Sequence, residues 1–190
     1  MDSSPLWGRE LGYSAKESLL MAKMSDEPLS DQPLSDETMA SIHNCANDAL
    51  SILGPKYASA VPAIVVAAVD EFAYRWQKGK RPPADVVEDT DTARLIFGSL
   101  WGEQLVKQFG WEWAKVNFSE ESVAFGVVSP DRSLVIYPLD FMLWCMQTPR
   151  ADVTVALSFN MLLEGRVPPD AKRQSYTNFM KRVIRIVPRD

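Results

Sequence analysis

Apolar residues recur every three to four positions through the middle of the chain, which is the period of a helix with one buried face. Between Thr92 and Phe109, the apolar positions at intervals of four are Ala93, Phe97, Trp101, Leu105 and Phe109. Asp91 or Thr92 is expected to cap the start of this helix, and Gly110 stands where a glycine commonly ends one. The pattern predicts a buried helix against which the rest of the chain packs.

Three short runs of alternating apolar and polar residues follow, and such alternation is typical of strands with one buried face. The runs are Trp111–Phe118, Ser122–Val128 and Ser133–Tyr137. Within the first run, Trp111 and Trp113 fall on one face, and the smaller apolar residues fall on the other. A proline-containing turn at 129–132 joins the last two runs. These signals predict an antiparallel meander.

The remaining chain reads mainly as helical. A first helix is expected from Asp36 to Leu53, capped by Ser35 or Asp36. A second should run from about Ser59 to Gln77, and its alanines and β-branched residues on nearly all sides predict heavy burial. Residues 153–164 alternate like a strand, yet capping residues frame them as a helix, which we favour. Pro138 opens another helix, and residues 168–188 predict a basic final helix.

These elements predict an α+β fold, in which a helical N-terminal half packs with a small three-stranded antiparallel meander and C-terminal helices. Residues 1–35 are rich in acidic side chains and contain the phrase PLSD, which is repeated at 33–36. We expect a flexible acidic arm there, because such a composition is poorly suited to a packed core. Residues 36–190 are then long enough for one single domain.

Composition and charge argue against several classes of function. The net charge of −5 argues against sequence-independent nucleic-acid binding, which needs clustered Lys and Arg. Cys45 and Cys145 lie far apart without a CxxC pair, so we expect two free thiols, no metal site and no cofactor. The N-terminus lacks the order of a secretory signal, and the longest apolar run, Tyr57–Val69, is too short to cross a bilayer. A cytoplasmic protein without membrane contact is therefore expected.

Two glycines, Gly98 and Gly102, lie one turn apart inside the central helix, where each costs about 1 kcal/mol relative to alanine. Close approach of a neighbouring element is the expected reason, and contact with a ligand is the alternative. The candidate ligand-binding residues for that alternative are Trp101, Glu103 and Trp113. The single histidine, His43, is interpreted as a packed or surface residue rather than a catalytic one.

A run of carboxylates precedes the central helix in a proline-punctuated connection. Its members are Asp85, Glu88, Asp89 and Asp91. The run lacks the glycine and glutamate spacing of a calcium loop, so metal binding is not predicted. Because such connections lie at the surface, these four side chains are the first candidates for contact with a basic protein partner.

Three short motifs carry a resemblance to a known family. They are FGSLWGE at Phe97–Glu103, FGWEW at Phe109–Trp113 and IYPLD at Ile136–Asp140. Together they resemble the bacterial family called domain of unknown function 3806, which has a glycine-glutamate helix, a glycine and tryptophan entering a strand, and an aromatic-proline step into a helix. The resemblance covers about 85–163 and implies no established activity.

Small, acidic α+β proteins of this kind resemble, in general character, the immunity proteins that bacteria keep against toxins. We therefore expect a non-enzymatic, cytosolic bacterial binding protein that neutralises a basic toxin or effector by direct protein–protein contact. The alternative is a small-molecule-binding protein or hydrolase-type enzyme with its site near Trp101, Glu103 and Trp113. A regulatory scaffold that docks through the N-terminal arm is also left open.

Overall fold

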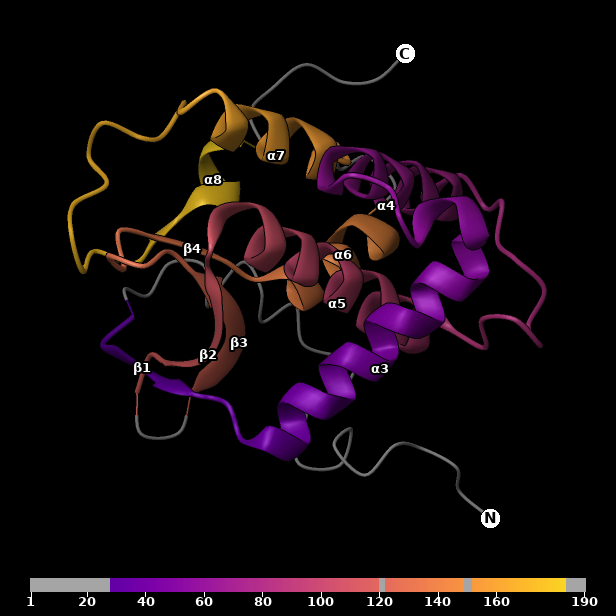
Figure 1. The fold of residues 1–190 in the computed structure, drawn as a ribbon, viewed down its shortest axis with the longest axis horizontal. Coiled ribbons are helices and arrows are strands. Elements are labelled where there is room, and N and C mark those ends of the chain that lie inside the picture. The colour runs from indigo at the N-terminus through magenta and orange to yellow at the C-terminus, as the bar shows by residue number, and fades with distance from the viewer. Residues whose placement is uncertain (1–27, 120–121, 149–151, 184–190) are drawn as a thin grey trace.

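The computed structural model describes residues 28–119, 122–148 and 152–183. Within these ranges the protein is α+β, as predicted, with a mixed sheet at one side and the helices packed against it (Figure 1). The helices are α3 (Asp36–Leu53), α4 (Pro62–Gln77), α5 (Thr90–Phe109), α6 (Pro138–Gln147), α7 (Val155–Leu163) and α8 (Phe179–Val183), with a short 3₁₀ turn, η1, at Pro55–Tyr57.

Helix α5 lies at the centre and contacts α3, α4 and α6 (Figure 1). Phe97 and Trp101 on this helix are completely buried, so the prediction of a central buried helix is confirmed. The cap at its start is Asp89, whose carboxylate accepts a hydrogen bond from the Thr92 N–H, and not Asp91 or Thr92 as predicted. Gly110 ends the helix in the left-handed conformation, with φ of 66°.

The strands form one sheet in the order β1-β2-β3-β4-β5. Their bounds are Ser30–Pro33 (β1), Glu112–Asn117 (β2), Val123–Val128 (β3), Leu134–Ile136 (β4) and Thr177–Asn178 (β5). The predicted meander is β2–β4, and all neighbouring pairs are antiparallel except β4 and β5, which are parallel. The sheet therefore exceeds the predicted three strands, because each end of the chain adds one strand at an edge.

Two segments differ from the expectations. Ser30–Pro33 lie in the predicted arm but pair with β2 at its open edge, where Pro33 needs no partner for a backbone N–H. Residues 168–176 do not form the predicted final helix. They cross the β3–β4 turn instead, and the N–H groups of Gln174 and Tyr176 donate to the carbonyls of Asp131 and Arg132. Residues 1–27 lie outside the described part, so the arm remains a prediction for them.

The other helix predictions are confirmed in type. Ser35 caps α3, and its hydroxyl accepts a hydrogen bond from the Thr38 N–H. The ambiguous residues 153–164 contain helix α7. Helix α4 begins at Pro62, a few residues later than expected. No helix in the described ranges is long and apolar enough to cross a membrane.

The sheet has two apolar faces. The inner face, which includes Trp113 and Val127, packs against the helices in the main core. The opposite face, here called the outer face, carries a second cluster of buried residues. It comprises Ala114, Val116, Phe118, Ala124, Val128, Val135 and Tyr137. This division confirms the predicted separation of Trp111 and Trp113 from the smaller residues of β2.

The two glycines of α5 allow close packing, as predicted. A Cβ at Gly98 would lie 2.9 Å from the Cα of Leu139, at the start of α6. A Cβ at Gly102 would fall inside the van der Waals radius of the Trp113 ring on β2. These contacts bring α5 against both α6 and the sheet, and so account for two glycines in a helix interior.

Candidate functional site

A groove of about 950 Å³ runs along the exposed side of α4. Helix α4 lies on the side of the molecule away from the sheet (Figure 1). The lining of the groove is largely apolar and includes Ala63, Ala68 and Phe72 of α4, together with Leu53 at the end of α3 and Tyr57 of η1. The lining of α4 from residue 63 to residue 75 spans about 18 Å at 1.5 Å per residue. We call this feature the α4 groove.

The groove corrects the expectation that α4 is buried on nearly all sides. One stripe of the helix, including Val65, Val69 and Trp76, faces the core. The other stripe faces solvent, so Ile64 keeps 55% of its surface exposed and lines the groove. Apolar residues on both stripes of α4 were the available sequence signal for this site, but sequence alone does not distinguish a second packed face from an open one.

The charged residues that line the α4 groove are mostly basic, although the chain as a whole is acidic. They are the cations Lys56, Arg75, Lys80 and Arg81 and the single carboxylate Glu71. Two of the cations are held by aromatic rings, because Arg81 lies 4.9 Å from the centre of the Trp76 ring and Lys56 lies 4.8 Å from that of Tyr57. None of the five forms an ion pair with another residue in the described ranges.

The predicted ligand residues are only partly brought together. The Trp113 Nε1–H donates to Glu103 Oε1 at 3.0 Å, and the second oxygen of Glu103 lies 3.4 Å from His43 Nε2 on α3. Trp101 is completely buried in the core, so it does not line a surface beside Glu103. The structure thus adds His43 to the candidate cluster and moves Trp101 away from it.

Glu103 orients the imidazole of His43, but this pair does not activate the thiol of Cys45. Cys45 follows His43 by two positions on α3, and residues with this spacing point to different sides of a helix. Burial, together with the charge of Asp48, raises the pKa of Cys45 to about 11. The thiol is therefore protonated at neutral pH and is a poor nucleophile.

The four carboxylates of the acidic run are all exposed, but two of them have structural roles. Asp89 caps α5, as described above, and Asp91 Oδ1 accepts a hydrogen bond from Arg94 Nε at 2.9 Å. Asp85 and Glu88 make no such contact with the described residues. Asp89 and Asp91 therefore have structural roles, whereas Asp85 and Glu88 are open to a partner.

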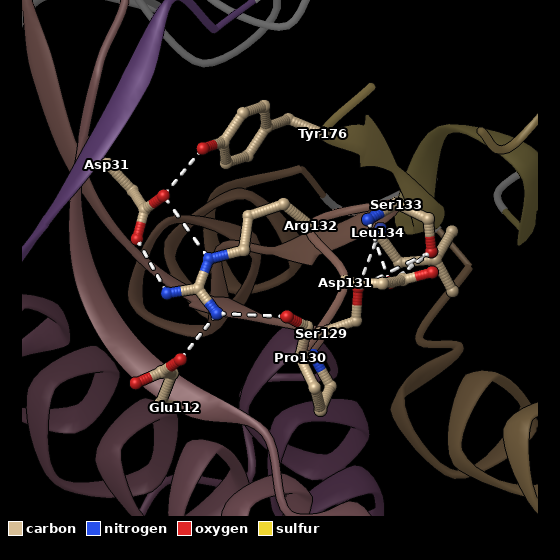
Figure 2. A network of polar contacts seen from close by, with 9 residues as sticks. All are labelled: Asp31, Glu112, Ser129, Pro130, Asp131, Arg132, Ser133, Leu134 and Tyr176. Carbon is tan, nitrogen blue, oxygen red and sulfur yellow. Dashed lines mark hydrogen bonds and ion pairs between the residues drawn. The ribbon is translucent and has the colours of Figure 1, made fainter. Parts of the chain in front are cut away.

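A polar network joins distant parts of the chain at the rim of the outer face (Figure 2). Arg132 Nη2 donates to Asp31 Oδ2 at 3.1 Å, and a second guanidinium nitrogen donates to Glu112. The Tyr176 hydroxyl donates to Asp31 Oδ1 at 2.5 Å. We call these four side chains the clasp, since they tie β1 and the residue before β5 to the β3–β4 turn.

The clasp shifts the pKa values of its members. Burial raises the pKa of Asp31, but the hydrogen bond from Tyr176 and the Arg132 guanidinium outweigh burial and lower it overall. Burial and the Asp31 hydrogen bond raise the pKa of Tyr176 to about 12. Arg132 and Tyr176 both adopt positive φ, 58° and 45°, so the contacts of the clasp hold two residues in a disfavoured backbone region.

No group of three or more His, Cys, Asp or Glu residues in the described ranges is placed to hold a metal ion. In comparisons with protein families, curated proteins and solved structures, the chain matches none. The resemblance to domain of unknown function 3806 therefore stays a prediction, and the site must be interpreted from its own chemistry.

Proposed function

We propose that this is a binding protein that holds an acidic, amphipathic helical segment of a partner protein in the α4 groove. One observation carries the proposal: four cations line the same groove as a set of apolar side chains, and none of the four forms an ion pair with the described residues. A ligand with both carboxylates and apolar side chains would form ion pairs with the cations and bury its apolar side chains against the apolar lining. An amphipathic helix has that composition on adjacent faces.

The dimensions of the groove favour a helical segment over a compact small molecule. Its length of about 18 Å along α4 matches roughly three turns of a partner helix. Exposed Ile64 and the half-buried Phe72 supply anchor points spaced along one side. The surrounding cations would steer an acidic segment toward the groove and raise its association rate at low salt.

This proposal keeps direct protein–protein contact but reverses the expected charge of the partner at the contact surface. The net charge of the chain suggests a basic partner, whereas the groove suits an acidic segment. Neutralisation of a bacterial toxin or effector remains a prediction within the proposal. The enzymatic alternative near Glu103 and Trp113 also remains a prediction, since burial of Trp101 removes one of its three residues.

The test is selection from a displayed library of helical peptides that vary in charge and apolar spacing. Enriched peptides are expected to carry acidic residues beside apolar residues at i, i+3 or i+4. Their affinity should fall at least tenfold for the variant Arg75→Glu/Lys80→Glu and for Ile64→Asp. Lys107→Glu/Lys172→Glu is the matched control, because both lysines are exposed and lie outside the groove.

Each outcome bears on the proposal. Wild-type affinity in both groove variants would place the peptides elsewhere and overturn it. If no peptide in the library is enriched, that result would also argue against a helical partner. Equal losses in the groove and control variants would show a non-specific effect of net charge rather than recognition by the groove.

A further inference from the structure

Residues 83–88, here called the acidic turn, carry the same chemistry that the α4 groove is proposed to bind. Two backbone N–H groups donate to the Pro83 carbonyl at 2.9 and 3.1 Å, which closes one helical turn. Asp85 and Glu88 are exposed, and Val86 between them keeps 46% of its surface exposed. The acidic turn therefore presents two carboxylates beside an apolar side chain.

The acidic turn adjoins the α4 groove but does not enter the groove of its own molecule. Pro82 and Pro83 line the groove and lead directly into the turn. Val87, within the turn, is 2% exposed and packs in the main core, and Asp89 just beyond it caps α5. These two anchors fix the turn at the surface, and its two exposed carboxylates form no ion pair with the described residues. The turn is thus open to a second molecule.

We propose that the α4 groove binds the acidic turn of a second copy of this chain, and that the two copies associate about a two-fold axis. The charges are complementary, because neither the four cations of the groove nor Asp85 and Glu88 have an ion pair within the described ranges. Val86 would bury its side chain against the apolar lining, which includes the 55% exposed Ile64. Since groove and turn adjoin, one two-fold axis forms the same contact twice in a single interface.

This inference rests on the proposed function, because the second copy occupies the site assigned to the partner segment. Self-association then regulates access to the groove, since a partner segment must displace the acidic turn before it binds. The contact is weak, because exposed ion pairs contribute little each. The acidic turn is also shorter than the roughly three helical turns that the groove accommodates, so a longer partner helix can displace it.

Sedimentation of the full-length chain and of two charge reversals tests the inference. The wild-type chain should change from monomer to dimer over about a hundredfold range of protein concentration, and high salt should return it to monomer. Asp85→Lys/Glu88→Lys and Arg75→Glu/Lys80→Glu should each remain monomeric, because like charges then face each other at both contacts. An equimolar mixture of the two reversals should form dimers again, because both contacts then join opposite charges.

The control and the outcomes separate this inference from the proposed function. Lys107→Glu/Lys172→Glu alters the net charge as much as the groove reversal does, at exposed lysines outside the groove, and should dimerise like wild type. A wild-type chain that stays monomeric, a dimer that survives either reversal, or a mixture that stays monomeric would overturn the inference. Library peptides that bind the groove of a strictly monomeric chain would overturn it and leave the proposed function standing. Charge-dependent dimers without any enriched peptide would support it and argue against the partner segment.

Discussion

Replacement of Gly102 by alanine should destabilise this protein, although the same change stabilises most helices. Alanine is favoured over glycine by about 1 kcal/mol in a helix interior. Gly102, however, packs directly beneath the Trp113 ring, and the new methyl group would overlap that ring. The sign of the effect therefore depends on whether Trp113 can move.

The structure holds Trp113 firmly in place. The side chain is 5% exposed, and its Nε1–H is bonded to Glu103 at 3.0 Å. Overpacking a core position costs about 1–3 kcal/mol, and displacing the ring also strains or breaks a hydrogen bond with a net value of about 1 kcal/mol. After subtraction of the helix-propensity gain, we expect a loss of about 1–3 kcal/mol in the free energy of unfolding. For a chain of this size, that is about 2–12 °C in Tm.

Urea denaturation of Gly102→Ala in two backgrounds isolates the contact. In the wild-type background the midpoint should fall. In a Trp113→Val background the ring is absent, so the same substitution should be neutral or stabilising by up to about 1 kcal/mol. Gly98→Ala is the contrasting case, because the opposing atom is the Cα of Leu139 and truncation of that side chain should not relieve it. A higher midpoint for Gly102→Ala in the wild-type background would refute the reasoning.

Two further predictions concern charged groups. Arg132→Leu should cost about 2–3 kcal/mol, less than a fully buried pair, whereas Arg166→Leu at the exposed pair with Glu164 should cost at most about 1 kcal/mol in chemical denaturation. The lowered pKa of Asp31 means that its contribution is complete above its ordinary pKa of 3.8 and disappears as the pH falls through the lower folded value. Tyr176 contributes fully below its ordinary pKa of 10.0 and loses that contribution as the pH rises through about 12. Urea midpoints across pH should show both losses in wild type, and the acid-side loss from Asp31 should be weaker in Arg132→Leu, because Arg132 helps to lower the pKa of Asp31; an unchanged acid-side profile would contradict the clasp. In the acidic run, Asp89→Ala should lose about 1 kcal/mol with the α5 cap, while Asp85→Lys/Glu88→Lys should stay within about 0.5 kcal/mol of wild type in the same assay. Equal losses would mean that Asp89 does not act as the cap.

The sequence predicted those parts of the fold whose signals are local. Helix α5 and strands β2–β4 follow from apolar periodicity and from turn residues within or beside each element. Strand β1 could not be found in this way, because Ser30–Pro33 contain no apolar alternation and become a strand only by pairing with β2, far along the chain. The two residues of β5 likewise form a strand only because they pair with β4.

The candidate site was less predictable than the fold. The carboxylates of the acidic run were visible as a cluster, but the structural duties of Asp89 and Asp91 depend on where α5 begins. The α4 groove depends on which stripe of α4 meets the core and on how residues 80–83 turn back beside it. Both are consequences of tertiary packing, which a one-dimensional pattern does not contain.

The clasp has a consequence for synthesis on the ribosome. The Tyr176 hydroxyl and the Asp31 carboxylate are separated by 145 positions in the chain. At about 5–20 residues per second, translation needs roughly 7–30 s to bring the second group after the first. Arg132 is made before Tyr176, 101 positions after Asp31, so the ion pair of the clasp can form before its tyrosine hydrogen bond does. The sheet edge at β4 stays open still longer, because β5, which pairs with β4, begins only at Thr177.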